Sequence, residues 1–357
     1  MKLLCSLLLL LATVASAQWQ KVPVATTASL RGLSVVNQNV IWASGTGGTV
    51  IRTVDGGKNW AVIVVPGAEA LDFRGIHAFD EKNAVIISSG PAEKGQAHIY
   101  RTSDGGKNWQ QVFEEKRAGI FFDAVAFWDR KHGIVLSDPV DGKFALFTTD
   151  DGGATWKQIP PAALPAALKN EGAFAASNSC LTVQGASNVW FATGGASVAR
   201  VFRSSDRGKS WQVAETPIHP ANASSGIFSL AFEDAKNGIA VGGDYAHPEG
   251  SNLPSVMRTS DVGKTWQAGT PTIPGGLYLS SVVNTPLKDG FVAAGIKGMF
   301  HNVGEYPWIR MGEENLNSVG LTVKGTSVVD IWAVGPKGAV IHTEIRYVAP
   351  PPVSQPK

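Results

Sequence analysis

Eight residues in this sequence combine the two chemistries that binding and catalytic sites most often use. Arginines offer paired N–H donors that recognise carboxylates. Two carboxylates at a defined separation can carry out glycoside hydrolysis. The candidates for a ligand-binding site are Arg31, Arg74, Asp123, Asp138, Asp141, Glu171, Asp244 and Tyr245. Asp123, Asp138, Glu171 and Asp244 could supply a hydrolytic pair, but the sequence gives no distance between them, so we predict no catalytic residue.

Other chemistries find less support in the sequence. The seven histidines are scattered without metal-ligand spacing, so we predict no metal site and no cofactor. "GTGGTV" at Gly45 is glycine-rich like a phosphate loop, but it aligns with "GIKGMF" at Gly295 and "GPKGAV" at Gly335 and is therefore a recurring turn. A formal net charge of +2 argues against a nucleic-acid partner bound by phosphate neutralisation.

The elements that must position the candidates follow from a repeated phrase. "RTSDGGKNW" ends at Trp109, and similar phrases end at Trp60, Trp156, Trp211 and Trp266. Each lies between two alternating runs, which predicts a β-hairpin whose turn is built by an aspartate, a glycine and a hydroxyl residue. We therefore assign a structural role to the turn aspartates, which are Asp55, Asp104, Asp151, Asp206 and Asp261.

The spacing of these tryptophans, 47 to 55 residues, is typical of propeller blades. Each repeat contains strands A to D, with the phrase between C and D. Two further repeats lack the phrase: one has a degenerate turn ending at Trp308, and the last stops after strand C. "WQKVPV" from Trp19 matches the strands that follow the phrase. We predict an all-β, single seven-bladed propeller that the N-terminal strand closes.

The phrases resemble the Asp-box (BNR) repeats of sialidases, xyloglucanase-type glycosidases, sortilin-type receptors and photosystem II stability/assembly factors. A single seven-bladed propeller with little else attached is most similar to the last group. The resemblance covers nearly the whole chain after residue 17 and implies a fold rather than a reaction, because the box marks a turn. It also implies that the boxes lie on the blade periphery, away from the ligand face.

A ligand site is expected on the face of the B–C and D–A connections, around the channel. The eight candidates lie at predicted starts of strand A and ends of strand B. The longest insertions are expected on the same face, at residues 160–172 and 216–226 (D–A) and 242–255 (B–C). Long loops on one face of a rigid scaffold usually bind something. The alternative is that these aspartates and arginines only pair with one another.

The chain is predicted to be exported. Residues 1–17 read as a signal peptide, with an apolar run before the small-residue site Ala15–Ala17 and cleavage after Ala17, too short for a membrane span. After cleavage only Cys180 remains, and we expect it to be buried. The propeller spans residues 18–347, and the proline-rich tail 348–357 is expected to be disordered.

The sequence therefore favours an exported, periplasmic or secreted, non-enzymatic propeller. The assembly-factor resemblance implies a protein or peptide partner, and we expect a monomer. The alternative is a carbohydrate-active propeller, either a sialidase-like or other glycoside hydrolase or a lectin, with a glycan as ligand. For a sialidase, Arg31 and Arg74 would be two of a required arginine triad, but the Arg-Ile-Pro phrase of those enzymes is missing.

Overall fold

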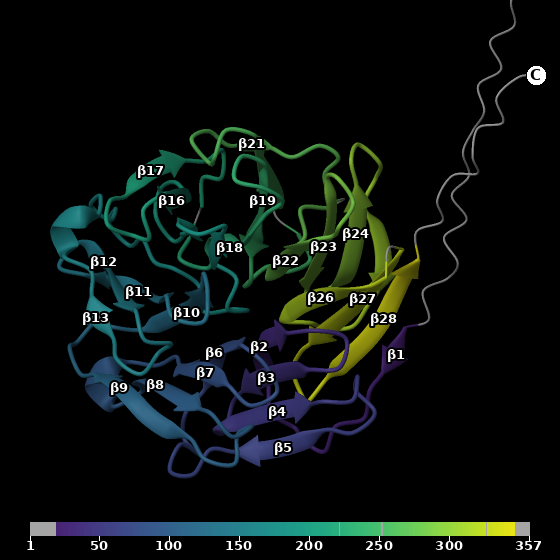
Figure 1. Cartoon of the computed structure of the whole chain (residues 1–357). Coiled ribbons are helices and arrows are strands. Elements are labelled where there is room, and N and C mark those ends of the chain that lie inside the picture. Colours follow the sequence, from purple (N-terminus) through teal and green to yellow (C-terminus); the bar gives the residue numbers. More distant parts are fainter. Residues whose placement is uncertain (1–18, 221, 251–252, 274, 326, 347–357) are drawn as a thin grey trace, which may run out of the picture.

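The computed structural model describes residues 19–346, except 221, 251–252, 274 and 326. Within these residues, 28 strands form seven four-stranded antiparallel sheets arranged in a ring (Figure 1). Each inner strand contacts the inner strands of both neighbouring blades. The predicted all-β seven-bladed propeller is confirmed. The predicted signal peptide and proline-rich tail lie outside the described residues, and no described helix is long and apolar enough to cross a bilayer.

In six blades the strands run from the axis outward in chain order. Blade 1 consists of β2 (Leu30–Val35), β3 (Ile41–Gly45), β4 (Thr49–Thr53) and β5 (Ala61–Val64). Blade 2 consists of β6 (Phe73–Ala78), β7 (Ala84–Ser88), β8 (Ala97–Thr102) and β9 (Gln110–Glu115), with the 3-10 turn η1 (Ala92–Lys94) before β8. Blade 3 consists of β10 (Phe122–Phe127), β11 (Gly133–Val140), β12 (Lys143–Thr149) and β13 (Lys157–Gln158), followed by the 3-10 turn η2 (Pro161–Ala163).

The remaining blades complete the ring. Blade 4 consists of β14 (Leu181–Gln184), β15 (Asn188–Ala192), β16 (Arg200–Ser204) and β17 (Gln212–Glu215). Blade 5 consists of β18 (Ser225–Phe232), β19 (Gly238–Asp244), β20 (Val256–Thr259) and β21 (Gln267–Ala268). Blade 6 consists of β22 (Ser281–Asn284), β23 (Gly290–Gly295), β24 (Gly298–Val303) and β25 (Ile309–Gly312). Blade 7 consists of β26 (Ser318–Lys324), β27 (Val328–Val334), β28 (Val340–Arg346) and, outermost, β1 (Gln20–Lys21).

The N-terminal strand closes the ring, as predicted. Gln20 pairs with His342 and Lys21 with Ile341, and the Val22 N–H donates to the Val340 carbonyl at 2.9 Å. Figure 1 shows β1 beside β28, where the two ends of the described chain meet. β1 thus completes blade 7 and covers the outer edge of β28, which could otherwise pair with another chain.

The Asp boxes form the C–D turns, and the box of blade 2 illustrates their chemistry. Asp104 accepts hydrogen bonds from the Asn108 backbone N–H at 3.0 Å and the Asn108 side-chain amide at 2.7 Å. The Thr102 hydroxyl donates to Asp104 at 3.0 Å and accepts the Gly106 N–H at 3.0 Å. These donors hold the pKa of Asp104 at about 2. The Asp104 carboxylate is therefore held by hydrogen bonds from residues of its own turn.

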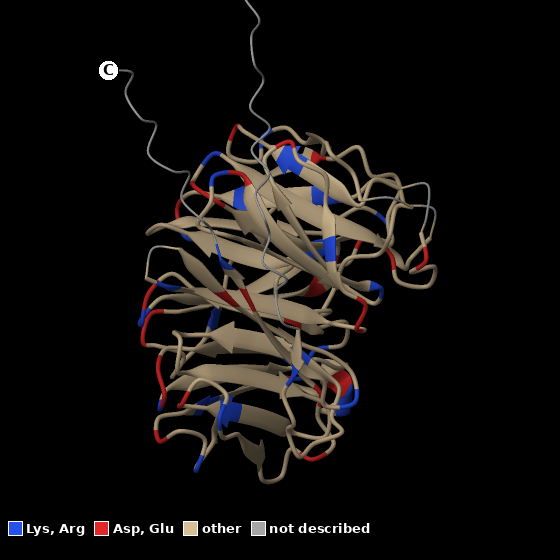
Figure 2. Ribbon diagram, turned by 90° about the vertical axis from the view of Figure 1, so that its right-hand side faces the viewer, with Lys and Arg blue, Asp and Glu red and all other residues tan. Residues whose placement is uncertain are grey.

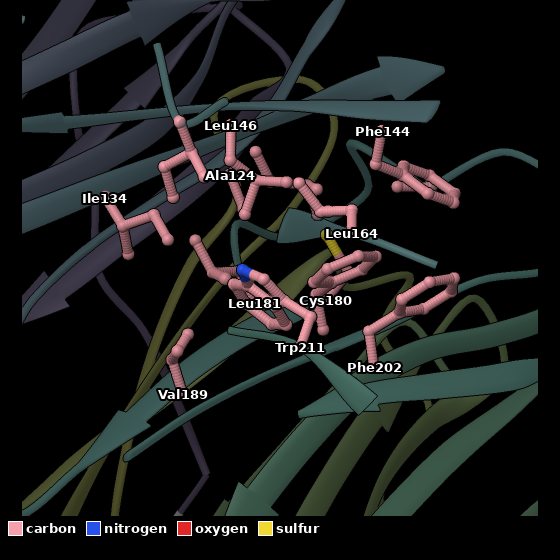
Figure 3. Close-up of a cluster of buried hydrophobic side chains, with 14 residues drawn as sticks. Ala124, Ile134, Phe144, Leu146, Leu164, Cys180, Leu181, Val189, Phe202 and Trp211 are labelled. Carbon is pink, nitrogen blue, oxygen red and sulfur yellow. The ribbon is translucent and has the colours of Figure 1, made fainter. Parts of the chain in front are cut away.

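The tryptophan that follows each box lies at the seam with the preceding blade. Trp60 of blade 1 contacts Trp332 of blade 7 edge to face at 5.7 Å between ring centroids, and Trp109 of blade 2 contacts Trp42 of blade 1 at 6.4 Å. The same seams hold the hydrophobic core, which is divided into clusters between blades. Figure 3 shows the cluster between blades 3 and 4, where Cys180 is fully buried beside Trp211.

The D–A connection before blade 4 departs from the prediction. Strand A was expected to start beside Glu171, but β14 begins at Leu181. The preceding residues, 172–180, enter the centre of the ring, and we call them the plug. The Asn178 side chain accepts the Val125 N–H at 2.8 Å and donates to the carbonyls of Ile76 and Val125 at 3.2 and 3.1 Å. The plug thereby contacts blades 2 and 3.

The other side of the plug contacts the opposite blades. The Ser177 hydroxyl donates to the Ser280 carbonyl of blade 6 at 2.6 Å, and the Ser318 hydroxyl of blade 7 donates to the Ser177 carbonyl at 3.3 Å. The Ser179 carbonyl accepts the Leu230 N–H of blade 5 at 2.9 Å. Because these bonds converge from five blades, the plug closes the channel. We call the loop-face end of the plugged channel, which the B–C and D–A connections surround, the mouth.

Candidate functional site

The inner strands carry the same irregularity in four blades. A β-bulge interrupts the A–B register in blades 1, 2, 3 and 5, between Leu30 and Gly32, Phe73 and Gly75, Phe122 and Ala124, and Ile227 and Ser229. The residues at the bulges are Arg31, Arg74, Asp123 and Phe228. Bulges re-aim side chains, here at the loop-face end of strand A. Three of the four bulge residues are among the predicted candidates.

The structure brings Arg31 and Arg74 together. The pKa of Arg31 is lowered first by burial and then by the charge of Arg74, whereas Asp72 and Tyr278 raise it. Arg74 donates from Nε to Asp72 at 2.7 Å, and its guanidinium lies 5.9 Å from the centre of the Phe121 ring. Among the described residues, no carboxylate lies within 4.0 Å of the Arg31 guanidinium. Asp72 is thus the nearby carboxylate for both Arg31 and Arg74.

Asp123, close enough to Arg74 to feel its charge, has an environment that is unusual for a carboxylate. It is 1% exposed, and neither carboxylate oxygen has a hydrogen-bond partner. Burial, together with repulsion from Asp138, raises the pKa of Asp123 well above its ordinary value, while Arg74 acts in the opposite direction. Burial also raises the pKa of Asp138 to about 6, although Asp138 accepts the Ala173 N–H at 2.9 Å. The environment therefore disfavours negative charge on both groups, and Asp123 neutralises the arginines less than its position suggests.

Two of the predicted carboxylates are held by other residues of the protein. Glu171 forms a buried ion pair with Arg200, which donates from Nε at 2.8 Å, and it also accepts the Thr193 hydroxyl at 2.7 Å. This pair anchors the entrance of the plug to strand C of blade 4. Asp141 lies apart from both, exposed in the B–C turn of blade 3 with φ of 51°.

Asp244 is the second saturated carboxylate. It accepts hydrogen bonds from the side chains of Asn222, Ser224 and His247 and from the Ala246 N–H, at 2.6 to 2.9 Å. Although burial acts in the opposite direction, these bonds hold its pKa well below the ordinary range. Asp244 therefore fixes the start of the B–C loop of blade 5, which carries Tyr245.

Sequence reasoning missed four residues at this mouth. Asp72 partners Arg74, and the aromatic residues Phe174, Phe228 and Tyr278 surround the predicted Tyr245. One signal was available: "GIFSL" places Phe228 where "DFRGI" places Arg74 and "FFDAV" places Asp123. Phe174 had no such signal, because it comes from the plug.

One cluster of metal-ligand types lies elsewhere, in blade 7. Asp330, His342 and Glu344 have donor atoms within 4.8 Å of one another. However, the Lys324 ammonium donates to Asp330 at 3.0 Å and to Glu344 at 2.9 Å. A cation is thus already supplied by the protein, and the cluster is a salt-bridge network of the blade.

The fold and the five boxes define an Asp-box β-propeller with a plugged channel and an arginine pair at its mouth. Residues 11–120 match the family described as photosynthesis system II assembly factor YCF48, and residues 201–213 match the BNR-Asp box repeat. The chain is thus similar to photosystem II assembly factors over residues 11–120 and to the Asp-box repeat in blade 4. No curated protein matches the sequence.

Solved structures of similar fold include two YCF48 structures and a GH74 enzyme. "YCF48 bound to D1 peptide" is 15% identical, with TM-score 0.62 over 93% of this chain and 97% of that one. YCF48 from Cyanidioschyzon merolae is 18% identical, with TM-score 0.61 over 91% and 98%. An ancestral GH74 enzyme is 12% identical, with TM-score 0.62 over 96% of this chain and 49% of that one. At these identities the likeness concerns the fold.

Proposed function

We propose that this protein is an exported, non-enzymatic propeller that binds an acidic peptide segment of a partner protein at the mouth of its plugged channel. The observation that carries the proposal is the arginine pair, because Arg31 and Arg74 share one nearby carboxylate, Asp72, and the neighbouring Asp123 is buried. Guanidinium groups with unused N–H donors recognise carboxylates through paired hydrogen bonds.

Two further observations support a peptide ligand. One protein of the same fold has been solved with a D1 peptide bound. Charges of both signs are interspersed over the molecule (Figure 2), so a partner would be selected by local contacts rather than by a field of one sign. Export is supported by the predicted signal peptide, and a monomer by the closed ring.

A carbohydrate-active propeller is the alternative, and the carboxylates weigh against it. A glycosidase needs two carboxylates that reach the scissile bond from either side. Asp123 is 1% exposed, Glu171 is bonded to Arg200 and Asp244 to four donors. Asp138 remains, with a pKa near 6, and it lacks an accessible second carboxylate among these candidates. We therefore favour peptide binding over hydrolysis.

The test compares two fluorescein-labelled decapeptides of glycine and serine. The acidic one carries two aspartates and a free C-terminal carboxylate. Its neutral counterpart carries asparagines in their place and an amidated C-terminus. We expect the acidic peptide to bind, and Arg31→Ala with Arg74→Ala to weaken it at least about tenfold at an unchanged melting temperature. The control, Arg130→Ala with Arg207→Ala, removes the same charge from the opposite face. Equal weakening by both double variants, or equal binding of the two peptides, would contradict the proposal.

A further inference from the structure

Four aromatic rings meet at one side of the mouth, and we call them the aromatic platform. Phe174 of the plug stacks on Phe228 with 3.9 Å between ring centroids. Tyr245 stands edge-on to Phe174, Phe228 and Tyr278, at 6.4, 6.1 and 6.5 Å. Phe228 and Tyr278 are buried and Phe174 is half-buried, whereas Tyr245 is 49% exposed. The platform is thus a buried aromatic base that presents one ring to solvent.

Tyr245 differs in position from the other exposed large hydrophobic residues. Within the described part of the chain these are Val54, Val62, Val64, Tyr306, Ile309 and Val323. They lie in C–D turns, on outer strands or at the A–B end of an inner strand. Tyr245 alone among them lies on the face of the B–C and D–A loops, where the arginine pair opens. An isolated exposed aromatic is ordinary, but one built on a buried aromatic base beside charged groups is typical of a binding subsite.

The platform adjoins the arginine pair through Tyr278. The pKa of Tyr278 is raised by burial, lowered by the charge of Arg31 and raised by Tyr245, so the phenol lies within electrostatic reach of both neighbours. The backbone geometry agrees, because Phe228 of the platform occupies in blade 5 the strand-A bulge position that Arg31 and Arg74 occupy in blades 1 and 2. The platform and the arginine pair therefore face the same end of the channel.

The exposed ring is also held in place before any ligand arrives. The Tyr245 N–H donates to the Ser224 carbonyl at 3.2 Å, and the preceding Asp244 is fixed by four donors. Pre-organised aromatic side chains contribute affinity because little conformational freedom is lost on binding.

We propose that the partner segment carries an aromatic or large aliphatic side chain close to its carboxylate, and that this side chain packs on Tyr245 while the carboxylate binds Arg31 and Arg74. The inference rests on the proposed function and narrows it from an acidic peptide to an acidic peptide with an apolar neighbour. Charge complementarity to the arginines selects a peptide over a neutral sugar as the occupant of the platform.

The experiment is a double-mutant cycle between peptide and protein. The probes are fluorescein-labelled glycine-serine peptides with a free C-terminal carboxylate and a phenylalanine one, two or three residues before it, each with an alanine counterpart. We expect at least one phenylalanine peptide to bind about tenfold more tightly than its counterpart, equivalent to about 1.4 kcal/mol. Tyr245→Ala should abolish that difference and leave the affinity of the alanine peptide unchanged. Tyr306→Ala, which removes a tyrosine 74% exposed on the opposite face, is the matched control.

The outcomes separate the inference from the function on which it rests. If all peptides bind equally and depend on Arg31 and Arg74, the platform is not a subsite and the peptide-binding function stands. If none binds, both proposals fail at this face. If a neutral hexasaccharide binds in a way that Tyr245→Ala abolishes and Arg31→Ala does not affect, the platform binds sugar and the inference is overturned.

Discussion

At the bulged position of strand A, one backbone device is repeated around the ring while the side chain changes. Blades 1 and 2 place arginine there, blade 3 places aspartate and blade 5 places phenylalanine. The bulge leaves one residue unpaired, so its identity does not affect the sheet and is available for function. The mouth can therefore be charged on one side and aromatic on the other without any cost in strand pairing.

Asp138 gives this mouth a dependence on pH. Its pKa is raised from 3.8 to about 6, so the folded state retains a proton that the unfolded state loses, and ionisation opposes folding as pH rises from about 4 to 6. The same ionisation adds negative charge beside Asp123, which lies within reach of Arg74. We expect affinity for the acidic decapeptide to rise about two- to fivefold from pH 7.5 to 5, where the peptide stays ionised.

The Asp138→Asn variant should bind the decapeptide with a flat profile over this range and should not lose stability at pH 7. Fluorescence anisotropy at several pH values measures the binding, and thermal unfolding measures the stability. Asp141→Asn, at an exposed position of the turn that follows β11, is the control and should keep the slope of the unchanged protein. A slope that survives in Asp138→Asn would assign the titration to another group.

At the scale of elements, the plug closes the central channel of the ring. Its side-chain and backbone bonds reach blades 2, 3, 5, 6 and 7, and the buried Glu171–Arg200 pair fixes its entrance. The element has no regular secondary structure, so its backbone groups must be satisfied by strands that surround it. It also supplies Phe174 to the aromatic platform, so the plug is part of the proposed subsite.

Asn178→Ala tests how far the ring depends on this element. The substitution removes three hydrogen bonds at the axis and leaves the backbone groups of Ile76 and Val125 unpaired, so we expect a loss of about 2–3 kcal/mol in the free energy of unfolding. Urea denaturation followed by tryptophan fluorescence measures it. Gln212→Ala, on the exposed edge strand β17, should change the midpoint little. An unaltered midpoint for Asn178→Ala would show that the plug rests in the ring without supporting it.

At the scale of the whole molecule, the ring closes through a very short strand. β1 has two residues, and its neighbour Trp19 packs in the seam between blades 6 and 7, where it covers Gly312. Closure therefore depends on side-chain burial at least as much as on strand pairing. The strand comes from the other end of the chain, so no local hairpin holds it.

Removal of residues 18–25 should open blade 7 and expose the edge of β28. We expect the melting temperature to fall by roughly 10 °C, from the lost burial of Trp19 and its neighbours, and the protein to self-associate. Light scattering after size exclusion and thermal unfolding measure the two effects. Removal of residues 348–357 is the control of similar length. A truncated protein that stays monomeric with its melting temperature intact would refute closure by β1.

The sequence by itself determined the repeated parts of this protein. Each Asp box, each pair of flanking strands and each tryptophan at a seam depends on residues within one repeat, so local patterns predicted seven blades, five boxes and the matching strand at Trp19. Only the tertiary structure decided the site. Arg74 pairs with Asp72, and Glu171 pairs with Arg200. Asp123 is buried without a hydrogen-bond partner, and Phe174 of the plug stacks on Phe228. Asp72 and Arg74 lie two residues apart, and Glu171 and Arg200 both border blade 4, but nothing in the repeated pattern marks them as partners. The bulge residues of different blades meet only around the axis, and the plug is an irregular segment of a single connection, so no period within a repeat records these contacts.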